Sequence, residues 1–585
     1  MSSTTTTTGS ATKPKRGGRR SLPHILLLVT DQFRFDAVSP QITPNLYQFL
    51  YSNSNNTTAT TTTTVAFEYA YSSTPTCTPA RAALLTGKSP WAHGMLSYGA
   101  YTNCTRYATT LPRVLRDVLS YRTAAIGKNH FGPLRHVQGY QDESSIYDGL
   151  PEYKDDYDVW FAQQTATTDD DDDDGMDPLA TCHLGWNDWP ACPYVYEEYL
   201  HPTAWTTRRA LEYLEQYFDN DDKDDKDEAQ PLLLKVSYHR PHSPYDPPRR
   251  FFDAFLSPDG ALARVPQLQR HVNASSWDGR YQNTTSGMPR HAWHGDPGAA
   301  AARHSRAGYL ASVAFVDDGI GQILRFLQQQ GGGGRTSSLY NDFLIVWTSD
   351  HGDMNGDHYL WRKGYPWEGS AHIPMAWKLP SSSSSSTSSH RTSHALVENR
   401  DVAPTIYDAL GILHHVQQQL DPLLDGKSLW PILTGQQQGG VREYLDLEHG
   451  AVYNATIHWN ALIGRLDDDY DENGDDGDTS IVNEHQHCER WKYIFNAHDG
   501  SEQLFCLDTD PNEYVDLAQA APRALEAWRQ RLVNQFVQQG RGPSWVKNGT
   551  LQIRPHSTVY GPNFPCQATE AAASPKTNIR QSKSL

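Results

Sequence analysis

The sequence predicts an α/β fold in two domains: a large domain with a central β-sheet flanked by helices, and a smaller C-terminal α+β domain with an antiparallel sheet. Short apolar runs in the larger, N-terminal part of the chain are typical of strands buried on both faces of a sheet. Near the C-terminus a period-two pattern indicates a hairpin. The chain of 585 residues is also too long for one simple core.

Four short apolar runs are predicted to be buried strands: His24–Thr30, Thr123–Ile126, Leu232–Tyr238 and Phe343–Ser349. The first is followed by Asp31 and Gln32, and the last by Asp350 and His351. In open α/β sheets, ligands bind outside the carboxyl ends of the strands. We therefore expect the two pairs to converge, and their oxygen atoms suit one hard cation.

The segment Cys77–Lys88, CTPARAALLTGK, carries the most chemical information in the chain. Pro79 suits the first turn of a helix, and the residues after it are good helix formers. Cys77 is therefore expected at a helix N-terminus, where unpaired backbone N–H groups favour an anion. Arg81, one turn further, has a planar fork that can hold an anionic oxygen. A lone cysteine is most often a small buried apolar residue, so the motif depends on the rest of the chain for support.

This segment resembles the signature of the type I (formylglycine-dependent) sulfatase family, an arylsulfatase-like branch of the alkaline phosphatase superfamily. In that family the cysteine is converted to formylglycine, whose hydrated aldehyde attacks sulfur, expels the alcohol and then releases sulfate. The resemblance implies an alkaline-phosphatase-like large domain with a mixed central sheet. It also implies a formylglycine at Cys77, made by a formylglycine-generating maturation enzyme.

The resemblance further implies one bound calcium ion (Ca2+) per chain, with these metal ligands: Asp31, Gln32, Cys77, Asp350 and His351. Two of these positions depart from the family, which often has Asp in place of Gln32 and Asn in place of His351. Gln32 still offers a carbonyl oxygen. The nitrogen of His351 suits calcium less well, so this residue either binds the metal or contacts the sulfate or the nucleophile.

Besides Cys77, the resemblance implies five catalytic or sulfate-binding residues: Arg81, Lys128, His130, His242 and Lys363. Their convergence in an acidic protein would suit a dianion-like transition state. Either His242 or His130 would protonate the leaving alcohol, because imidazole titrates near neutral pH. Sequence alone leaves that choice open, and it favours a structural role for His239.

Later stretches support the same resemblance. Tyr309–Gly321 has the apolar spacing of an amphipathic core helix. Asn399–Ile406 resembles the family's late Asp-x-x-Pro-Thr element. The small domain is predicted to contain a hairpin and then a helix: Trp491–Phe495, Glu502–Phe505 and about Pro522 to Gln538.

We predict a disordered N-terminal tail over 1–20, a catalytic domain over 21–435, a small antiparallel-sheet subdomain over 441–560 and a tail over 561–585. Low-complexity inserts interrupt this organisation and are predicted to be solvated loops. The clear inserts are Thr4–Thr8, Thr57–Thr64, Asp169–Asp174, Asp219–Glu228, Gly331–Gly334, Ser381–Ser389 and Asp467–Asp478.

Composition restricts the possible partners. The formal net charge is −18, and the acidic runs make nucleic acid an unfavourable partner. No apolar stretch approaches the length of a membrane span. The sequence does not indicate an oligomeric state.

Cysteines and glycosylation sequons bear on the compartment. Cys182–Cys192 and Cys488–Cys506 are plausible local disulfides. Together with the sequons, they favour a secretory, lysosomal or extracellular location, although residues 1–20 do not resemble a signal peptide. The sequons begin at Asn55, Asn56, Asn103, Asn273, Asn283, Asn454 and Asn548.

The expected function is hydrolysis of a sulfate monoester to an alcohol and inorganic sulfate. A sulfated glycan is preferred to a small aryl ester, because the stretches around His242 and Lys363 resemble a branch that includes glycan sulfatases. Two alternatives stay open: a phosphonate or phosphate monoester hydrolase using the same aldehyde, and a non-catalytic binding protein if Cys77 remains a thiol. Glu448 and His449 are either pocket-rim residues or surface polar residues at the end of a strand.

Overall fold

The computed structural model describes residues 22–51, 63–98, 107–149, 154–165, 184–219, 230–269, 281–282, 288–330, 338–381, 389–450, 454, 456–466 and 488–565. The predicted N-terminal tail and most of the low-complexity inserts lie outside these ranges, as does Cys182.

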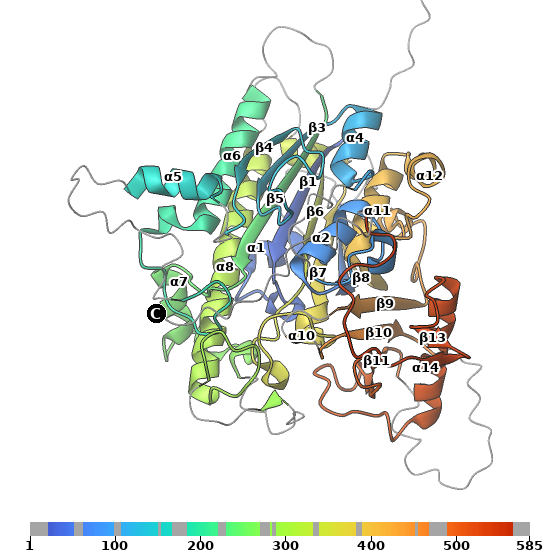
Figure 1. Ribbon diagram of the computed structural model, residues 1–585. Helices are drawn as coiled ribbons and strands as arrows, with labels where there is room; N and C mark the ends of the chain where they lie inside the picture. Colours follow the sequence, from blue (N-terminus) through green and yellow to red (C-terminus); the bar gives the residue numbers. More distant parts are fainter. Residues whose placement is uncertain are drawn as a thin grey trace, which may run out of the picture.

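Eight of the described strands form one mixed sheet in the order β4-β3-β5-β1-β6-β7-β2-β8. Strand β7 is antiparallel to both of its neighbours, and the other pairings are parallel. The four predicted strands are confirmed as β1, β3, β5 and β6, and β1 lies between β5 and β6 (Figure 1). The strands are β1 His24–Asp31, β2 Thr63–Tyr71, β3 Arg122–Gly127, β4 Asp142–Ile146, β5 Leu232–Pro241, β6 Phe343–Ser349, β7 His372–Lys378 and β8 Ser389–Glu398.

Strand β1 shows why an unbroken apolar run forms a strand here. Ile25, Leu27 and Val29 pack into one hydrophobic core, and Leu26 and Leu28 pack into the core on the opposite face of the sheet. All five are fully buried. Burial of such a side chain stabilises the folded state by roughly 1.5–3 kcal/mol. A polar substitution on either face of this strand would therefore destabilise the fold.

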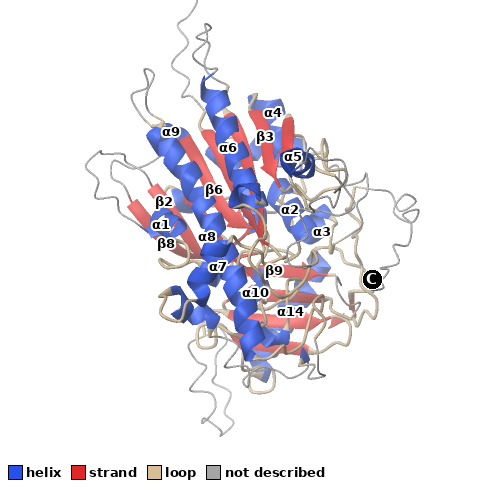
Figure 2. Cartoon of the chain, turned by 90° about the vertical axis from the view of Figure 1, so that its left-hand side faces the viewer, coloured by secondary structure: helices blue, strands red, loops and turns tan. Residues whose placement is uncertain are grey.

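Helices cover both faces of the sheet (Figures 1 and 2). Helices α1, α6, α7 and α8 pack on the face of Leu26, and α2, α4 and α11 pack on the face of Ile25. The predicted core helix is confirmed within the longer α8. The helices are α1 Pro44–Tyr51, α2 Cys77–Thr86, α3 Pro90–His93, α4 Leu111–Leu119, α5 Asp156–Thr165, α6 Pro202–Asp219, α7 Arg249–Leu256, α8 Ala299–Gln329, α9 Leu339–Asp342, α10 Glu368–Ala371, α11 Val402–Ala409, α12 Leu413–His415, α13 Trp430–Leu433 and α14 Pro522–Gln538.

The C-terminal part forms a second, antiparallel sheet in the order β12-β11-β10-β9. The predicted hairpin is β11 with β12, and the predicted helix is α14. One face of this sheet packs on α14 and the other on the large domain. The strands, with a small separate hairpin, are β9 Tyr444–His449, β10 Trp459–Gly464, β11 Trp491–Asn496, β12 Glu502–Cys506, β13 Val546–Lys547 and β14 Thr550–Leu551.

Disulfides and buried ion pairs reinforce the small sheet and its junction with the large domain. The predicted pair Cys488–Cys506 is bonded. Cys192 is also disulfide-bonded, and its predicted partner Cys182 lies outside the described residues. Lys492 of β11 is fully buried and pairs with Glu368 of α10 at 2.6 Å and with Glu513 at 2.7 Å. Within the described residues, no helix is long and apolar enough to cross a membrane.

Four residues of the predicted inserts belong to regular elements, so the loop prediction was wrong for them. Thr63 and Thr64 begin β2, where they are buried, Ser389 begins β8 and pairs with Thr63, and Asp219 ends α6. β-Branched threonine fits a pleated strand. A threonine-rich loop can therefore continue into a strand with no change in residue composition to mark the boundary.

Helix α1 is held by a side chain from another helix. Asp317 of α8 accepts hydrogen bonds from the backbone N–H groups of Asn45 at 3.0 Å and Leu46 at 2.7 Å. These donors lie in the first turn of α1, where no intrahelical partner exists. Asp317 therefore acts as an N-cap supplied through tertiary contact.

We predict that Asp317→Ala lowers the free energy of unfolding by about 1–3 kcal/mol, because the backbone N–H groups of Asn45 and Leu46 and the side-chain amide of Asn45 lose their acceptor. Burial raises the pKa of Asp317 from 3.8 to about 6. The folded state then holds this proton more tightly than the unfolded chain, so the associated stability is present below pH 4 and is lost as the pH rises through 6. Urea unfolding of Asp317→Asn should lack that loss.

The matched control is Asp318→Asn, one residue along the same helix but partly exposed. It should change the free energy of unfolding by less than about 0.5 kcal/mol. Equal effects at the two positions would refute the capping role of Asp317.

Candidate active site

The site begins at two neighbouring strand ends. Strands β1 and β6 are parallel and in register, with Thr30 opposite Ser349. Asp31 and Asp350 therefore leave the sheet side by side, as the sequence predicted. Both are almost completely buried, at 0% and 2% exposure.

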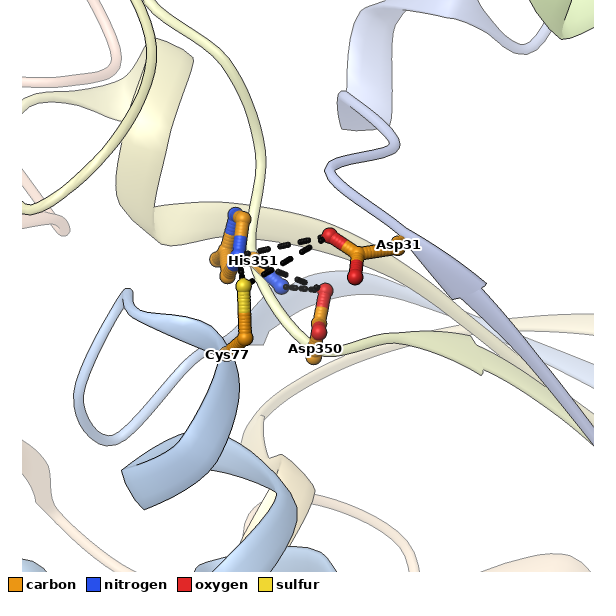
Figure 3. A group of neighbouring side chains, drawn as sticks. All are labelled: Asp31, Cys77, Asp350 and His351. Atoms are coloured by element: carbon orange, nitrogen blue, oxygen red, sulfur yellow. Dashed lines mark hydrogen bonds and ion pairs between the residues drawn. The ribbon is translucent and has the colours of Figure 1, made fainter. Parts of the chain in front are cut away.

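Cys77 is the first residue of α2, and its side chain points towards His351 and Asp31 (Figure 3). Its Sγ atom lies 3.1 Å from Nε2 of His351 and 3.8 Å from Oδ1 of Asp31. Thr76 before it is extended, and a left-handed Gly87 ends the helix. The residue order Thr-Cys-Thr-Pro thus places the sulfur at a helix N-terminus, as expected.

The two carboxylates use their oxygens differently. Oδ2 of Asp31 lies 2.6 Å from Nζ of Lys128 and 3.3 Å from Arg81, and Oδ2 of Asp350 lies 2.9 Å from Nε of Arg81. The Oδ1 atoms face inward, and each lies 3.6 Å from Nε2 of His351. Arg81 and Lys128 therefore neutralise the outer side of the pair and leave one oxygen of each aspartate directed at the centre.

Gln32 and Lys363 form the next part of the cluster. Gln32 has a positive φ of 68°, and its amide oxygen accepts a hydrogen bond of 2.9 Å from Nζ of Lys363. Its amide nitrogen donates to Asp353 at 2.5 Å, and Tyr245 donates to the same carboxylate oxygen. Sequence reasoning missed the role of Asp353, although it lies three residues after Asp350 in the same motif.

His242 and His130 are buried in the same region. Nδ1 of His242 donates to the carbonyl oxygen of Ser243 at 2.7 Å, which leaves Nε2 as the acceptor in the neutral ring. The ring of Tyr98 contacts His130 edge-on at 5.8 Å. The ring of His239 makes tilted contacts with the rings of His242 and Trp186, at centroid distances of 4.9 and 4.6 Å.

The charges of the cluster shift its pKa values in opposing directions. Burial would raise the pKa of Asp31, but the cations Lys128 and Arg81 hold it well below its ordinary value. Burial and then nearby lysines lower the pKa values of His242 and His130 well below normal. The neutral form of both imidazoles is therefore favoured.

The pKa values of Cys77 and of its imidazole neighbour His351 are also shifted, in opposite directions. Burial and Asp31 would raise the pKa of Cys77, but Lys363, Lys128 and His351 lower it. Burial would lower the pKa of His351, but Asp350 and Cys77 raise it. The centre of the cluster thus favours an anion at position 77 and a positive group between the two aspartates.

The loop before Cys77 is clamped by distant segments. Ser73 donates from its backbone and its hydroxyl to the amide oxygen of Asn399, whose nitrogen donates to Ala80. The hydroxyl of Thr76 bonds to Nε2 of His449. These contacts, which cross more than 300 residues of chain, were missed by the sequence analysis because no local pattern records them.

Glu448 and His449 are buried rather than surface polar residues, so that alternative was wrong. Glu448 pairs with Arg541, and His449 stacks on Trp459 of β10 with ring centroids 6.0 Å apart. The end of β9 therefore brings the small domain against the loop that carries Cys77.

The donor set fits a divalent cation. Asp31, Cys77, Asp350 and His351 each direct one ligand atom to a common region in which all of these atoms lie within 4.8 Å of one another. Two inward carboxylate oxygens with positive groups behind them suit a cation at that point. Gln32 adds an amide oxygen nearby, whose present partner is Lys363.

Comparisons with known proteins agree with this geometry. The sulfatase family model matches residues 23–412. The arylsulfatase of Clostridium perfringens (strain 13 / Type A) is 27% identical over 516 residues, covering 85% of this chain and 90% of that protein.

Two solved structures share the fold. The phosphonate monoester hydrolase of Agrobacterium radiobacter matches 88% of this chain and 96% of its own, with a TM-score of 0.60 and 20% identity. The enzyme BT4656, in complex with its substrate D-glucosamine-2-N,6-O-disulfate, matches 90% of this chain and 100% of its own, with a TM-score of 0.59 and 19% identity. With a family model over most of the chain, an alkaline-phosphatase-like fold and the expected residues gathered at one strand edge, this chain belongs to the sulfatase family.

Proposed function

We propose that this protein hydrolyses a sulfate monoester of a carbohydrate, with formylglycine derived from Cys77 as nucleophile and calcium as the bound ion. The observation that carries the proposal is the position of Cys77 at the N-terminus of α2, against Asp31, Asp350 and His351. An anionic group that reached this point would meet the helix terminus and several buried cations together.

The residues of the chain divide the work as follows. Lys128 and Lys363 bind sulfate oxygens, and Arg81 orients the nucleophile while neutralising Asp31 and Asp350. The hydrated aldehyde supplies an oxygen nucleophile and a route for release of sulfate. Asp31, Gln32, Asp350 and His351 would hold the calcium ion, which supplies Lewis-acid polarisation of the sulfate.

His242 is the preferred proton donor to the leaving alcohol. Its Nδ1 is bound to a carbonyl oxygen, so a proton taken up at Nε2 is the one available for transfer. Burial and the lysines keep its pKa well below normal. The negative charge of a bound sulfate group offsets the positive charge of those lysines. Substrate binding therefore raises the pKa of the His242 imidazole.

A carbohydrate ester is supported by relatives. BT4656 is described with a disulfated glucosamine as its substrate. The residues assigned in this subsection bind the sulfate group rather than the sugar ring, so the carbohydrate part of the proposal rests on similarity.

Phosphonate or phosphate monoester hydrolysis is the second candidate, because a phosphonate monoester hydrolase shares the fold. Rates on matched 4-nitrophenyl sulfate, phosphate and phenylphosphonate esters decide between them. A higher kcat/KM on either phosphorus ester than on the sulfate would reverse the order of the two candidates.

We predict that Cys77→Ala lowers kcat by roughly 10³-fold or more, because the nucleophile is removed. The thermal midpoint should change little, since the variant removes a single small atom. Peptide mass spectrometry across Cys77 should show an aldehyde in active enzyme made in a host with the maturation machinery. If Cys77 remains a thiol in a host that converts the corresponding cysteine of another sulfatase, the result would favour the alternative that this protein is a non-catalytic binding protein.

We predict that Asp31→Asn and Asp350→Asn each lose bound calcium as well as activity. Asparagine keeps the shape of the side chain and removes one negative charge from the donor set. Metal content by mass spectrometry and calcium affinity by calorimetry measure the effect without using activity. Asp318→Asn on α8 is the control and should retain the ion. Full metal occupancy in either site variant would exclude that residue as a ligand.

A further inference from the structure

Trp186 lies against Lys128 and His242 of the site but has no role in the proposed mechanism. The Nζ atom of Lys128 lies 5.3 Å from the centroid of the indole ring. The ring centroid is 5.1 Å from that of His242 and 4.6 Å from that of His239. One side chain from outside the sheet therefore touches both the sulfate-binding lysine and the preferred proton donor.

The loop that carries Trp186 is held in place by its own hydrogen bonds. The backbone N–H of Gly185 donates to the carboxylate of Asp188 at 2.8 Å, and the N–H of Asp188 donates back to the carbonyl oxygen of Gly185 at 3.1 Å. Trp189 then bonds to the carbonyl of Arg290. Trp186 thus sits in a closed turn whose ends are fixed.

Two contacts fix the residue itself. Its carbonyl oxygen accepts a hydrogen bond of 3.1 Å from the hydroxyl of Ser243, the neighbour of His242. A Cβ atom at Gly149 would lie 2.6 Å from Cζ3 of Trp186, so the ring packs directly on a glycine backbone. The backbone of Trp186 and one edge of its ring are therefore both held by contacts within the fold.

The exposed fraction of the side chains changes sharply across this contact. Lys128 and His242 are 0% and 1% exposed, whereas Trp186 is partly exposed. The indole therefore lies between these two buried side chains and the solvent. The organic part of an ester whose sulfate group reaches Lys128 must lie on the outer side of this lysine, which is where the indole offers apolar surface.

We propose that Trp186 is a specificity-determining residue that binds the ring of the sulfated alcohol through the ring's apolar C–H face. This inference rests on the proposed function, since it assigns the leaving-group side of the same site. Indole provides a large rigid apolar surface, and sugar rings present C–H groups on their faces. Because Lys128 already lies over the ring, a neutral or anionic ring is favoured over a quaternary ammonium alcohol.

The test compares Trp186→Ala and Trp186→Phe on three esters: glucosamine 6-sulfate, choline sulfate and propyl sulfate. We expect Trp186→Ala to lower kcat/KM for the sugar ester by roughly 10-fold or more, mainly through KM, while propyl sulfate changes by less than about 3-fold. Trp186→Phe should recover most of the loss. Wild-type enzyme should prefer the sugar ester to choline sulfate.

Binding supplies a readout that does not depend on turnover. In the Cys77→Ala background, we expect calorimetry to show that Trp186→Ala lowers the affinity for glucosamine 6-sulfate by roughly 10-fold. The affinity for inorganic sulfate should fall by less than about 3-fold. Trp160→Ala is the control, because Trp160 is a partly buried tryptophan on α5 whose ring partners are Tyr157, Trp205 and Arg208. It should leave the ratio between the two ligands unchanged.

Two results would overturn the proposal. Equal losses for sugar sulfate, propyl sulfate and inorganic sulfate would mean that Trp186 only supports Lys128 and His242. Unchanged affinity for the sugar ester would mean that the indole does not contact the alcohol. If wild-type enzyme cleaves none of the esters but the binding difference persists, the proposed hydrolysis fails while the role of Trp186 stands.

Discussion

The structure depends on the pairing of two buried carboxylates with two buried cations. Asp31 and Asp350 end parallel strands in the centre of the sheet, where water cannot stabilise their charge. An unpaired buried charge costs several kcal/mol, so Arg81 and Lys128 have to lie within bonding distance. Arg81 reaches both aspartates from a position one turn after Cys77 in α2, and this requirement sets where that helix begins. The position of Cys77 follows directly from it.

The loop into α2 has few partners within its own segment, and the rest of the chain supplies them. Asn399, after β8, bridges Ser73 and Ala80, and His449 of the small sheet bonds to Thr76. The small domain therefore helps to hold the loop that leads into Cys77 as well as completing the core. Its junction with the large domain is polar at the centre, where Lys492 is shared by two carboxylates, and apolar around it. The same contacts place the end of β9 beside the loop that leads into Cys77.

Local sequence pattern was sufficient to predict many of the strands and helices. Buried parallel strands have unbroken apolar sequences, so β1, β5 and β6 were predictable, as were the hairpin β11–β12 and α14. Residues carried over from the family motif, among them Lys128, His242 and Lys363, meet at one sheet edge because each follows a strand or the Asp350 motif. The threonines at the start of β2 were misjudged because composition does not distinguish a threonine loop from a threonine strand. The hydrogen-bonded partners of Gln32 also could not be predicted, since its amide is oriented by Asp353 and Lys363.

The sequence by itself determined the α/β class, the position of Cys77 at a helix start and the acidic strand ends, because these follow from periodicity, helix-end chemistry and a contiguous motif. Only the tertiary structure decided which oxygen of each aspartate faces inward, that Asn399 and His449 clamp the loop before Cys77, and that Trp186 covers Lys128. Those features depend on side chains from segments far apart in the chain. Their distances and directions are set by packing, which no local spacing encodes.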